Sequence, residues 1–203
     1  MIIENCEQGS IEWRQLKAGV PGASSFDRII TTKGELSAQR TEYLDELARE
    51  KILGSIEDDY ASFAMREGLK KEAEARSLFE FITDKEAKQV GFVFKNESRN
   101  VGCSPDGMPE NTGLEIKCPK LKAHTKYLCD KKLPTDYFIQ VQGSMWVCDY
   151  DVWYFMSYYP GMPHLLLEVR RDDDFISKLE VAMAHFIRDL KKTHQELLDK
   201  INP

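Results

Sequence analysis

The sequence predicts a mixed α/β fold in which a central mixed sheet is flanked by helices. Apolar residues recur at helical spacing up to about residue 82 and again from residue 134. Between residues 90 and 118 they alternate with a period of two, and two further runs, 151–159 and 165–171, also resemble strands. A last amphipathic helix follows from residue 172. Because helices and strands succeed one another along the chain, the strands are expected to form an internal sheet.

Length and composition predict one folded domain that spans residues 1–203. No repeat or Pro/Gly/Ser-rich linker divides the chain, and its 42% hydrophobic and 31% charged residues are typical of a globular protein. The longest apolar run, residues 152–156, is too short to cross a membrane, and residues 1–7 lack a secretory pattern. A cytoplasmic location is therefore expected. Five cysteines without a C-x-x-C pair disfavour both a disulfide scaffold and a cysteine-ligated zinc or iron–sulfur site.

Three helices are expected in the first part of the chain. A turn-rich stretch at 19–25 precedes a short helix through residues 26–30. Residues 37–53 form the second helix, with Ser37 as a candidate N-cap and Gly54 as its stop. The third helix covers residues 59–82, and its stripe at helical spacing contains two charged residues: Met65, Leu69, Glu72, Arg76 and Phe79.

Strands are expected at residues 90–94, 101–104 and 113–118, where Pro119 ends the last of them. Pro134 begins a helix that reaches about residue 148. The segment between these two prolines is assigned no element. It is nevertheless unusual, because residues 116–133 contain six lysines and one aspartate, a local charge of +5 in a chain of net charge −6.

The residues with the clearest chemistry lie at a strand, a turn and a second strand. Glu115 and Lys117 are two residues apart on a strand and therefore project from the same face. Asp106 follows Pro105 at a turn and reaches the same edge if the two strands pair as a hairpin. Two carboxylates and a lysine suit Mg²⁺-assisted phosphodiester hydrolysis. The alternative is a surface hairpin with a salt bridge, because the spacing alone also occurs by chance.

These residues are part of a longer resemblance. Residues 104–107 (SPDG) followed by 113–119 (GLEIKCP) resemble the active-site signature of the phage lambda exonuclease family, the YqaJ-type viral recombinases of the PD-(D/E)xK nuclease superfamily. Four further blocks resemble that family in the same order: 10–24, 72–81, 140–147 and 153–155. The resemblance implies a restriction-endonuclease-like core for the α/β fold.

The family's residues, carried over one by one, imply a metal site and a catalytic set. Asp106, Glu115 and the backbone carbonyl of Ile116 would bind Mg²⁺, or alternatively Mn²⁺, and Glu72 would complete an acidic cluster near a second ion. Lys117 would be the catalytic lysine, with Gln140 orienting it or the attacking water. Glu72 could instead be an exposed i,i+4 partner of Arg76, and Gln140 part of a polar helix face.

The resemblance also implies contacts to the DNA end. Lys17 stands where the family has an arginine that holds the 5′-phosphate, and Ser24 could add a donor to it. A plain surface loop is the alternative for this segment. Met65 matches the position of an apolar wedge that separates terminal base pairs, although a methionine on a helix is more often a core residue.

The implied function is a Mg²⁺-dependent 5′-to-3′ exonuclease that acts on linear double-stranded DNA and leaves 3′ single-stranded overhangs for recombination. The family works as a homotrimeric ring with a single-strand annealing protein, and is encoded by phages or prophages. A ring would also allow an acidic exterior around a channel lined by the lysines of 117–132. Two alternatives remain open: a PD-(D/E)xK endonuclease, and a non-catalytic module that binds DNA ends.

Overall fold

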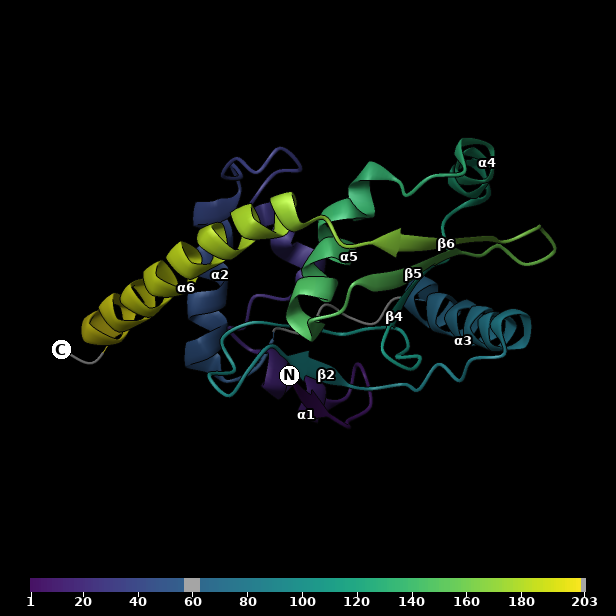
Figure 1. Cartoon of the computed structure of the whole chain (residues 1–203). Helices are drawn as coiled ribbons and strands as arrows, with labels where there is room; N and C mark the ends of the chain where they lie inside the picture. The colour runs from purple at the N-terminus through teal and green to yellow at the C-terminus, as the bar shows by residue number, and fades with distance from the viewer. Residues whose placement is uncertain (57–62, 202–203) are drawn as a thin grey trace.

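In the computed structural model the chain forms two small sheets surrounded by helices (Figure 1). The structure describes residues 1–56 and 63–201, with residues 63–67 and 69 described by their backbone alone. In chain order the elements are β1 (Ile2–Glu4), α1 (Ile11–Lys17), the 3₁₀ helix η1 (Ala23–Arg28), α2 (Arg40–Leu53), α3 (Phe63–Thr83), β2 (Phe92–Phe94), β3 (Gly102–Cys103), β4 (Gly113–Lys117), α4 (Leu121–Asp130), α5 (Thr135–Cys148), β5 (Val152–Ser157), β6 (Leu165–Arg170) and α6 (Asp173–Ile201).

The mixed sheet of the prediction is confirmed, but the strands divide into two sheets of three. One sheet has the order β4-β5-β6, in which β4 and β5 are parallel and β5 and β6 antiparallel. The other is antiparallel, with the order β1-β2-β3. The expected hairpin between the second and third predicted strands forms only locally, because β3 pairs with β2, while a single bridge joins Gly107 to Leu114.

Helices α3 and α5 cover opposite faces of the sheet that contains β4. Leu114 and Ile116 on β4 pack with Ala75 and Phe79 of α3 in one buried cluster. The intervening residue, Glu115, faces α5 instead. Because both faces are covered, β4 is buried along Gly113–Ile116.

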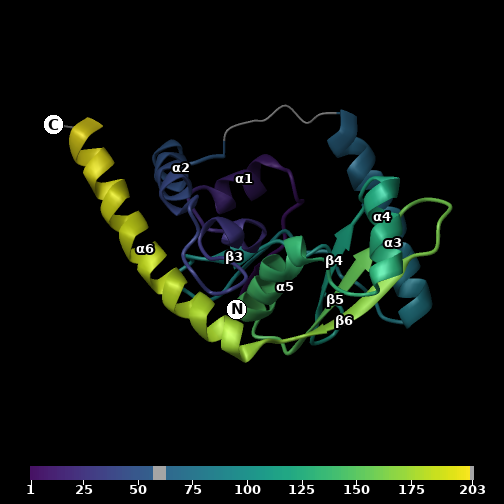
Figure 2. The same cartoon turned by 90° about the horizontal axis from the view of Figure 1, so that it is seen from above.

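The larger core lies around α5, α2 and α6, which lie close together in both views (Figure 1, Figure 2). The rings of Tyr43 on α2 and Phe186 on α6 stack with centroids 5.6 Å apart. Helix α5 packs closely on η1 at Gly143, where an added Cβ would lie 2.5 Å from the Phe26 ring. The absence of a side chain at Gly143 therefore allows the helix that carries Gln140 to pack against the core.

Most of the predicted elements are present, with shifts at their ends. Helix α2 begins at Arg40 rather than Ser37, because residues 30–36 first close a small loop with a bridge between Ile30 and Leu36. Its end is as predicted: Gly54 adopts a φ of 69° and its N–H donates to the Glu50 carbonyl. Three elements were not predicted, β1, α1 and α4. No helix in the described part of the chain is long and apolar enough to span a bilayer.

Candidate active site

The predicted residues Glu115, Lys117 and Gln140 meet at the face of β4 that is covered by α5. Nζ of Lys117 lies 2.6 Å from Oε1 of Glu115, and Nε2 of Gln140 donates to the same oxygen at 2.6 Å. Glu115 is only 2% exposed, so its carboxylate depends on these two donors for solvation. Gln140 therefore contacts the carboxylate of the motif and is not part of a free polar helix face.

Asp106 joins them from the open edge of β4. The Ile116 N–H donates to Asp106 Oδ2 at 2.6 Å, and the Asp106 N–H donates to the Leu114 carbonyl at 3.0 Å. With the bridge between Gly107 and Leu114, these bonds hold the Pro105–Gly107 turn against β4. The side-chain oxygens Asp106 Oδ1 and Glu115 Oε2 accept no hydrogen bond from the described residues.

Glu72 and Arg76 approach the same turn from α3. Nη2 of Arg76 lies 3.1 Å from Glu72 Oε1, so the i,i+4 pair considered as an alternative is present. It is not an exposed pair, however, because the two side chains are 22% and 14% exposed and Arg76 Nε also donates to the Asp106 carbonyl at 2.7 Å. Within the described residues, no three His, Cys, Asp or Glu side chains form a cluster that could hold a metal ion by themselves.

The charges of this site interact strongly. Burial, together with the neighbouring carboxylates of Glu115 and Glu72, raises the pKa of Asp106 well above its usual range. Burial also raises the pKa of Glu115, against the opposing effect of Lys117, and that of Glu72. Burial opposes the charge of Lys117, but the Glu115 carboxylate outweighs it and raises the pKa of this ammonium. Lys117 is therefore held in its charged form.

Tyr137 is a site residue that the sequence analysis missed. It lies one helical turn before Gln140 on α5, and the centroid of its ring is 5.0 Å from Nζ of Lys117. Burial and a hydrogen bond with Tyr127 raise the pKa of its hydroxyl to about 12. Tyr137 and Gln140 are three residues apart on a predicted helix and therefore share one face, so the sequence could have indicated that Tyr137 lies beside Gln140.

The N-terminal residues predicted to bind the DNA end also lie near the motif. Nζ of Lys17 lies 3.8 Å from the centroid of the Trp13 ring, and Trp13 Nε1 donates to Ser104 Oγ at 3.1 Å. A parallel bridge between Gly22 and Gly102 brings the start of η1, which contains the exposed Ser24, alongside the strand that leads to Ser104. Trp13 and Ser104 lie within the matching blocks 10–24 and 104–107, but their sequence pattern alone indicates no role for either.

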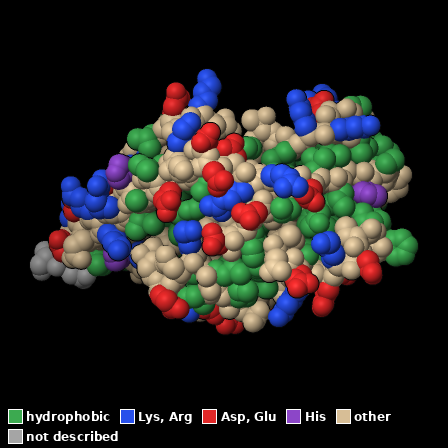
Figure 3. Space-filling view, viewed as in Figure 1, with side chains coloured by type: hydrophobic (Ala, Val, Ile, Leu, Met, Phe, Trp, Pro, Cys, Tyr) green, Lys and Arg blue, Asp and Glu red, His purple; other side chains and the backbone are tan. Residues whose placement is uncertain are grey.

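Met65 lies in α3, but its side chain is outside the described residues, so the wedge remains a prediction. The lysine-rich segment is better defined. It forms α4 and the turn after it, and Figure 3 shows Lys and Arg side chains gathered over α4, whereas elsewhere on that face both signs are interspersed. Tyr127 on α4 packs edge-on against Tyr137, whose ring lies beside Lys117, so α4 is joined to the candidate site.

Comparison with known proteins identifies the family. Residues 12–151 match the model of the YqaJ-like viral recombinase domain. The chain belongs to this family. A comparison with curated proteins gives no match. Among solved structures, this YqaJ-like chain is similar to an alkaline exonuclease from Laribacter hongkongensis, with a TM-score of 0.83, 26% identity and coverage of 94% of this chain and 97% of that one.

The same exonuclease solved in complex with dAMP gives a TM-score of 0.83 at 27% identity and the same coverage. A phage-related exonuclease from Haemophilus somnus 129PT matches with a TM-score of 0.66 and 16% identity, over 90% of this chain and 96% of that one. These matches confirm the predicted α/β fold of the PD-(D/E)xK type.

Proposed function

We propose that this YqaJ-like protein is a metal-dependent nuclease that digests linear double-stranded DNA from the 5′ end. The observation that carries the proposal is the meeting of Asp106, Glu115 and Lys117 at one edge of β4, with Gln140 on the same carboxylate as the lysine. Membership of the recombinase family and the likeness to an alkaline exonuclease support a nuclease that acts on DNA.

The donors present suit Mg²⁺. Asp106 and Glu115 each keep one carboxylate oxygen that accepts no bond from the described residues, and hard oxygen donors are the ligands that Mg²⁺ prefers. The pKa of Asp106 is raised by its burial and then by the neighbouring carboxylates of Glu115 and Glu72, and a bound cation would favour its ionised form. Asp106, Glu115 and the Ile116 carbonyl would hold one ion, and Glu72 would lie near a second. Bound Mg²⁺ would supply an activated water and neutralise charge on the phosphate.

Lys117 and Gln140 would have separate roles in the reaction. Lys117 is a charged donor held by Glu115 and the Tyr137 ring, so it is placed to stabilise negative charge that develops on the scissile phosphate. Gln140 fixes the Glu115 carboxylate and leaves its second oxygen for the metal. Mn²⁺, a hard divalent ion of similar preference, is expected to replace Mg²⁺.

The 5′ polarity rests on Lys17. Its ammonium lies on the Trp13 ring, and this ring is bonded to Ser104, two residues before Asp106. A terminal phosphate bound by Lys17, with hydroxyl donors from Ser24 and Ser104, would place the first phosphodiester of that strand near the metal-binding carboxylates. Digestion from this end leaves a 3′ single-stranded overhang, the substrate of a single-strand annealing protein.

The duplex itself needs a basic surface, and the exposed lysines of α4 and the following turn provide one: Lys122, Lys126, Lys131 and Lys132. In a homotrimeric ring this surface would line the channel. Light scattering should then give a mass of about three times 23.4 kDa. A monomer that still digests long DNA without dissociating would contradict the ring. A phage or prophage origin and a cytoplasmic location accord with this proposal.

One digestion experiment tests the proposal against its alternatives. Linear duplex DNA labelled at either the 5′ or the 3′ end, and unlabelled covalently closed circular duplex, are incubated with Mg²⁺ or with EDTA. We expect Mg²⁺-dependent loss of the 5′ label from linear DNA, with intact circles. Cleavage of circles would indicate an endonuclease of the same superfamily. Binding of ends without digestion in either Mg²⁺ or Mn²⁺ would indicate a non-catalytic module.

A further inference from the structure

Two side chains from distant parts of the chain hold consecutive carbonyl groups of the turn that carries Asp106. Gln8 Nε2 donates to the Pro105 carbonyl at 2.9 Å, and Arg76 Nε donates to the Asp106 carbonyl at 2.7 Å. The two donors come from the segment between β1 and α1 and from α3, respectively. The backbone on both sides of the Asp106 Cα is therefore restrained by partners outside β4.

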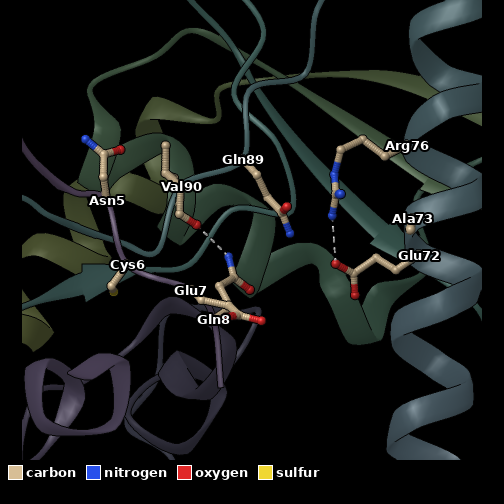
Figure 4. A pocket seen from close by; sticks show the side chains of 9 residues that line it. All are labelled: Asn5, Cys6, Glu7, Gln8, Glu72, Ala73, Arg76, Gln89 and Val90. Atoms are coloured by element: carbon tan, nitrogen blue, oxygen red, sulfur yellow. Dashed lines mark hydrogen bonds and ion pairs between the residues drawn. The ribbon is translucent and has the colours of Figure 1, made fainter. Parts of the chain in front are cut away.

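Gln8 is itself fixed. Its amide also donates to the Val90 carbonyl at 2.9 Å, so one side chain connects the N-terminal segment, the chain before β2 and the turn. Figure 4 shows Gln8 and Arg76 on opposite sides of a cavity of about 460 Å³, with Glu72 beside Arg76. Gln89 lines the same cavity but forms no hydrogen bond with the described residues.

The hydrogen bonds from Gln8 and Arg76 to the turn also affect the orientation of the Asp106 carboxylate. Pro105 has a fixed φ and no N–H, so hydrogen bonds at this residue must be accepted by its carbonyl. With both carbonyls held, the Asp106 side chain is directed at the Ile116 N–H, which it reaches at 2.6 Å. Trp13 adds a third restraint one residue earlier, because its Nε1 donates to Ser104 Oγ.

We propose that Gln8 and Arg76 are positioning residues that set the geometry of the metal-binding turn. Neither side chain is a candidate metal ligand: Gln8 acts through the Pro105 carbonyl, and Arg76 acts through the Asp106 carbonyl beside its ion pair with Glu72. The inference rests on the proposed function, in which Asp106 binds the ion. Gln8 lies outside residues 12–151 that match the family model, so the family pattern gives no indication of this role.

The test uses substitutions that remove the donors and little else. Gln8→Met keeps the length of the side chain without its amide, and Arg76→Lys keeps a cation opposite Glu72 without the fork that also reaches Asp106. Gln89→Met is the matched control, because it makes the same change at the same cavity where no hydrogen bond is lost. Mn²⁺ binding to the full-length protein without DNA is measured by calorimetry, and the Mg²⁺ concentration for half-maximal digestion is measured separately.

We expect Gln8→Met and Arg76→Lys to weaken Mn²⁺ binding and to raise the half-saturating Mg²⁺ concentration by about 10- to 100-fold, the usual effect of losing a group that orients a metal ligand. Excess Mg²⁺ should restore much of the maximal rate, and Gln89→Met should behave as wild type. A purely structural role would lower the melting temperature without changing the metal affinity of the folded protein, and that result would overturn the inference.

The inference and the proposed function fail in different ways. Wild-type protein that neither binds Mn²⁺ nor digests DNA would contradict the proposed function. Wild-type protein that does both, with unchanged metal affinity in both variants, would contradict only the positioning role. If Gln8→Met does not fold, Arg76→Lys decides alone.

Discussion

Lys117 and Glu115 form an ion pair on one face of a buried strand, with Nζ and Oε1 2.6 Å apart. Glu115 is 2% exposed, and the same carboxylate oxygen also accepts a hydrogen bond from Gln140. A charge this deeply buried is stabilised by its partners rather than by water. Because both donors bind Oε1, the ion pair leaves Oε2 of Glu115 available to a ligand. It also holds the Lys117 ammonium beside this carboxylate.

Lys117→Ala should keep the fold and DNA binding but reduce digestion by about 10²–10³-fold, because the charge that stabilises the reacting phosphate is removed. The rate of digestion is measured in Mg²⁺, and the affinity for linear DNA is measured separately in Ca²⁺. Lys192→Ala is the control, since this lysine is exposed on α6, away from the lysines of α4, and pairs with Glu196 one helical turn on. Near-normal digestion by Lys117→Ala would remove the lysine from the active site.

Asp106→Asn should raise the melting temperature in EDTA while abolishing metal binding. The pKa of Asp106 is raised, so its ionised form destabilises the folded protein at pH values above that pKa, and the neutral amide removes this cost. Each kcal/mol gained corresponds to roughly 2–4 °C in a chain of this size. Thermal denaturation with and without Mg²⁺ measures both effects: Mg²⁺ should stabilise the wild type and leave the variant unchanged. A lower melting temperature of the variant in EDTA would show that the ionised Asp106 carboxylate carries no such cost in the folded protein.

The preference for 5′-phosphorylated ends should depend on pH through Lys17. Burial lowers the pKa of this ammonium to about 8, so its charge is present below that pH and is lost above it. Below pH 8, digestion of 5′-phosphorylated duplex should exceed that of 5′-hydroxyl duplex by roughly 10- to 150-fold, the effect of one charge-assisted hydrogen bond. As the pH rises from 8 to 10 the ratio of the two kcat/KM values should fall.

Two variants test this assignment. Lys17→Ala should lose most of the preference at every pH without changing metal affinity, and Lys17→Arg should keep it up to pH 10 because guanidinium does not titrate there. If Lys17→Ala retains the full preference, the phosphate is held elsewhere, and the lysines of α4 are the next residues to substitute.

Gly143→Ala should destabilise the protein by about 1–3 kcal/mol, the usual cost of overpacking a core. The added methyl group would lie 2.5 Å from the Phe26 ring, which is fully buried and cannot move aside freely. Gly68→Ala on α3 is the control: beyond its own helix backbone, no atom of the residues that the structure describes lies within 4 Å of its added Cβ, so it should leave stability unchanged or raise it by up to about 1 kcal/mol. Urea denaturation of both variants decides the comparison.

The sequence by itself determined the local features of the site. A period of two places Glu115 and Lys117 on one face of a strand in any fold that keeps the strand. Gly54 ends α2 because glycine readily adopts the positive φ found there. The motif with Asp106, Glu115 and Lys117 was also recognisable, because its residues are close in the chain.

Only the tertiary structure decided what surrounds these residues. The parallel pairing of β4 with β5 and the division into two sheets depend on contacts between segments that are far apart in sequence. The lysine-rich segment forms the helix α4, whose buried residues are His124 and Tyr127. The many lysines of this segment gave no indication that these two side chains would be buried. Gln8 and Arg76 reach adjacent carbonyls from positions 97 and 30 residues distant. No local spacing encodes such bonds, since they form only after the whole core has brought the three segments together.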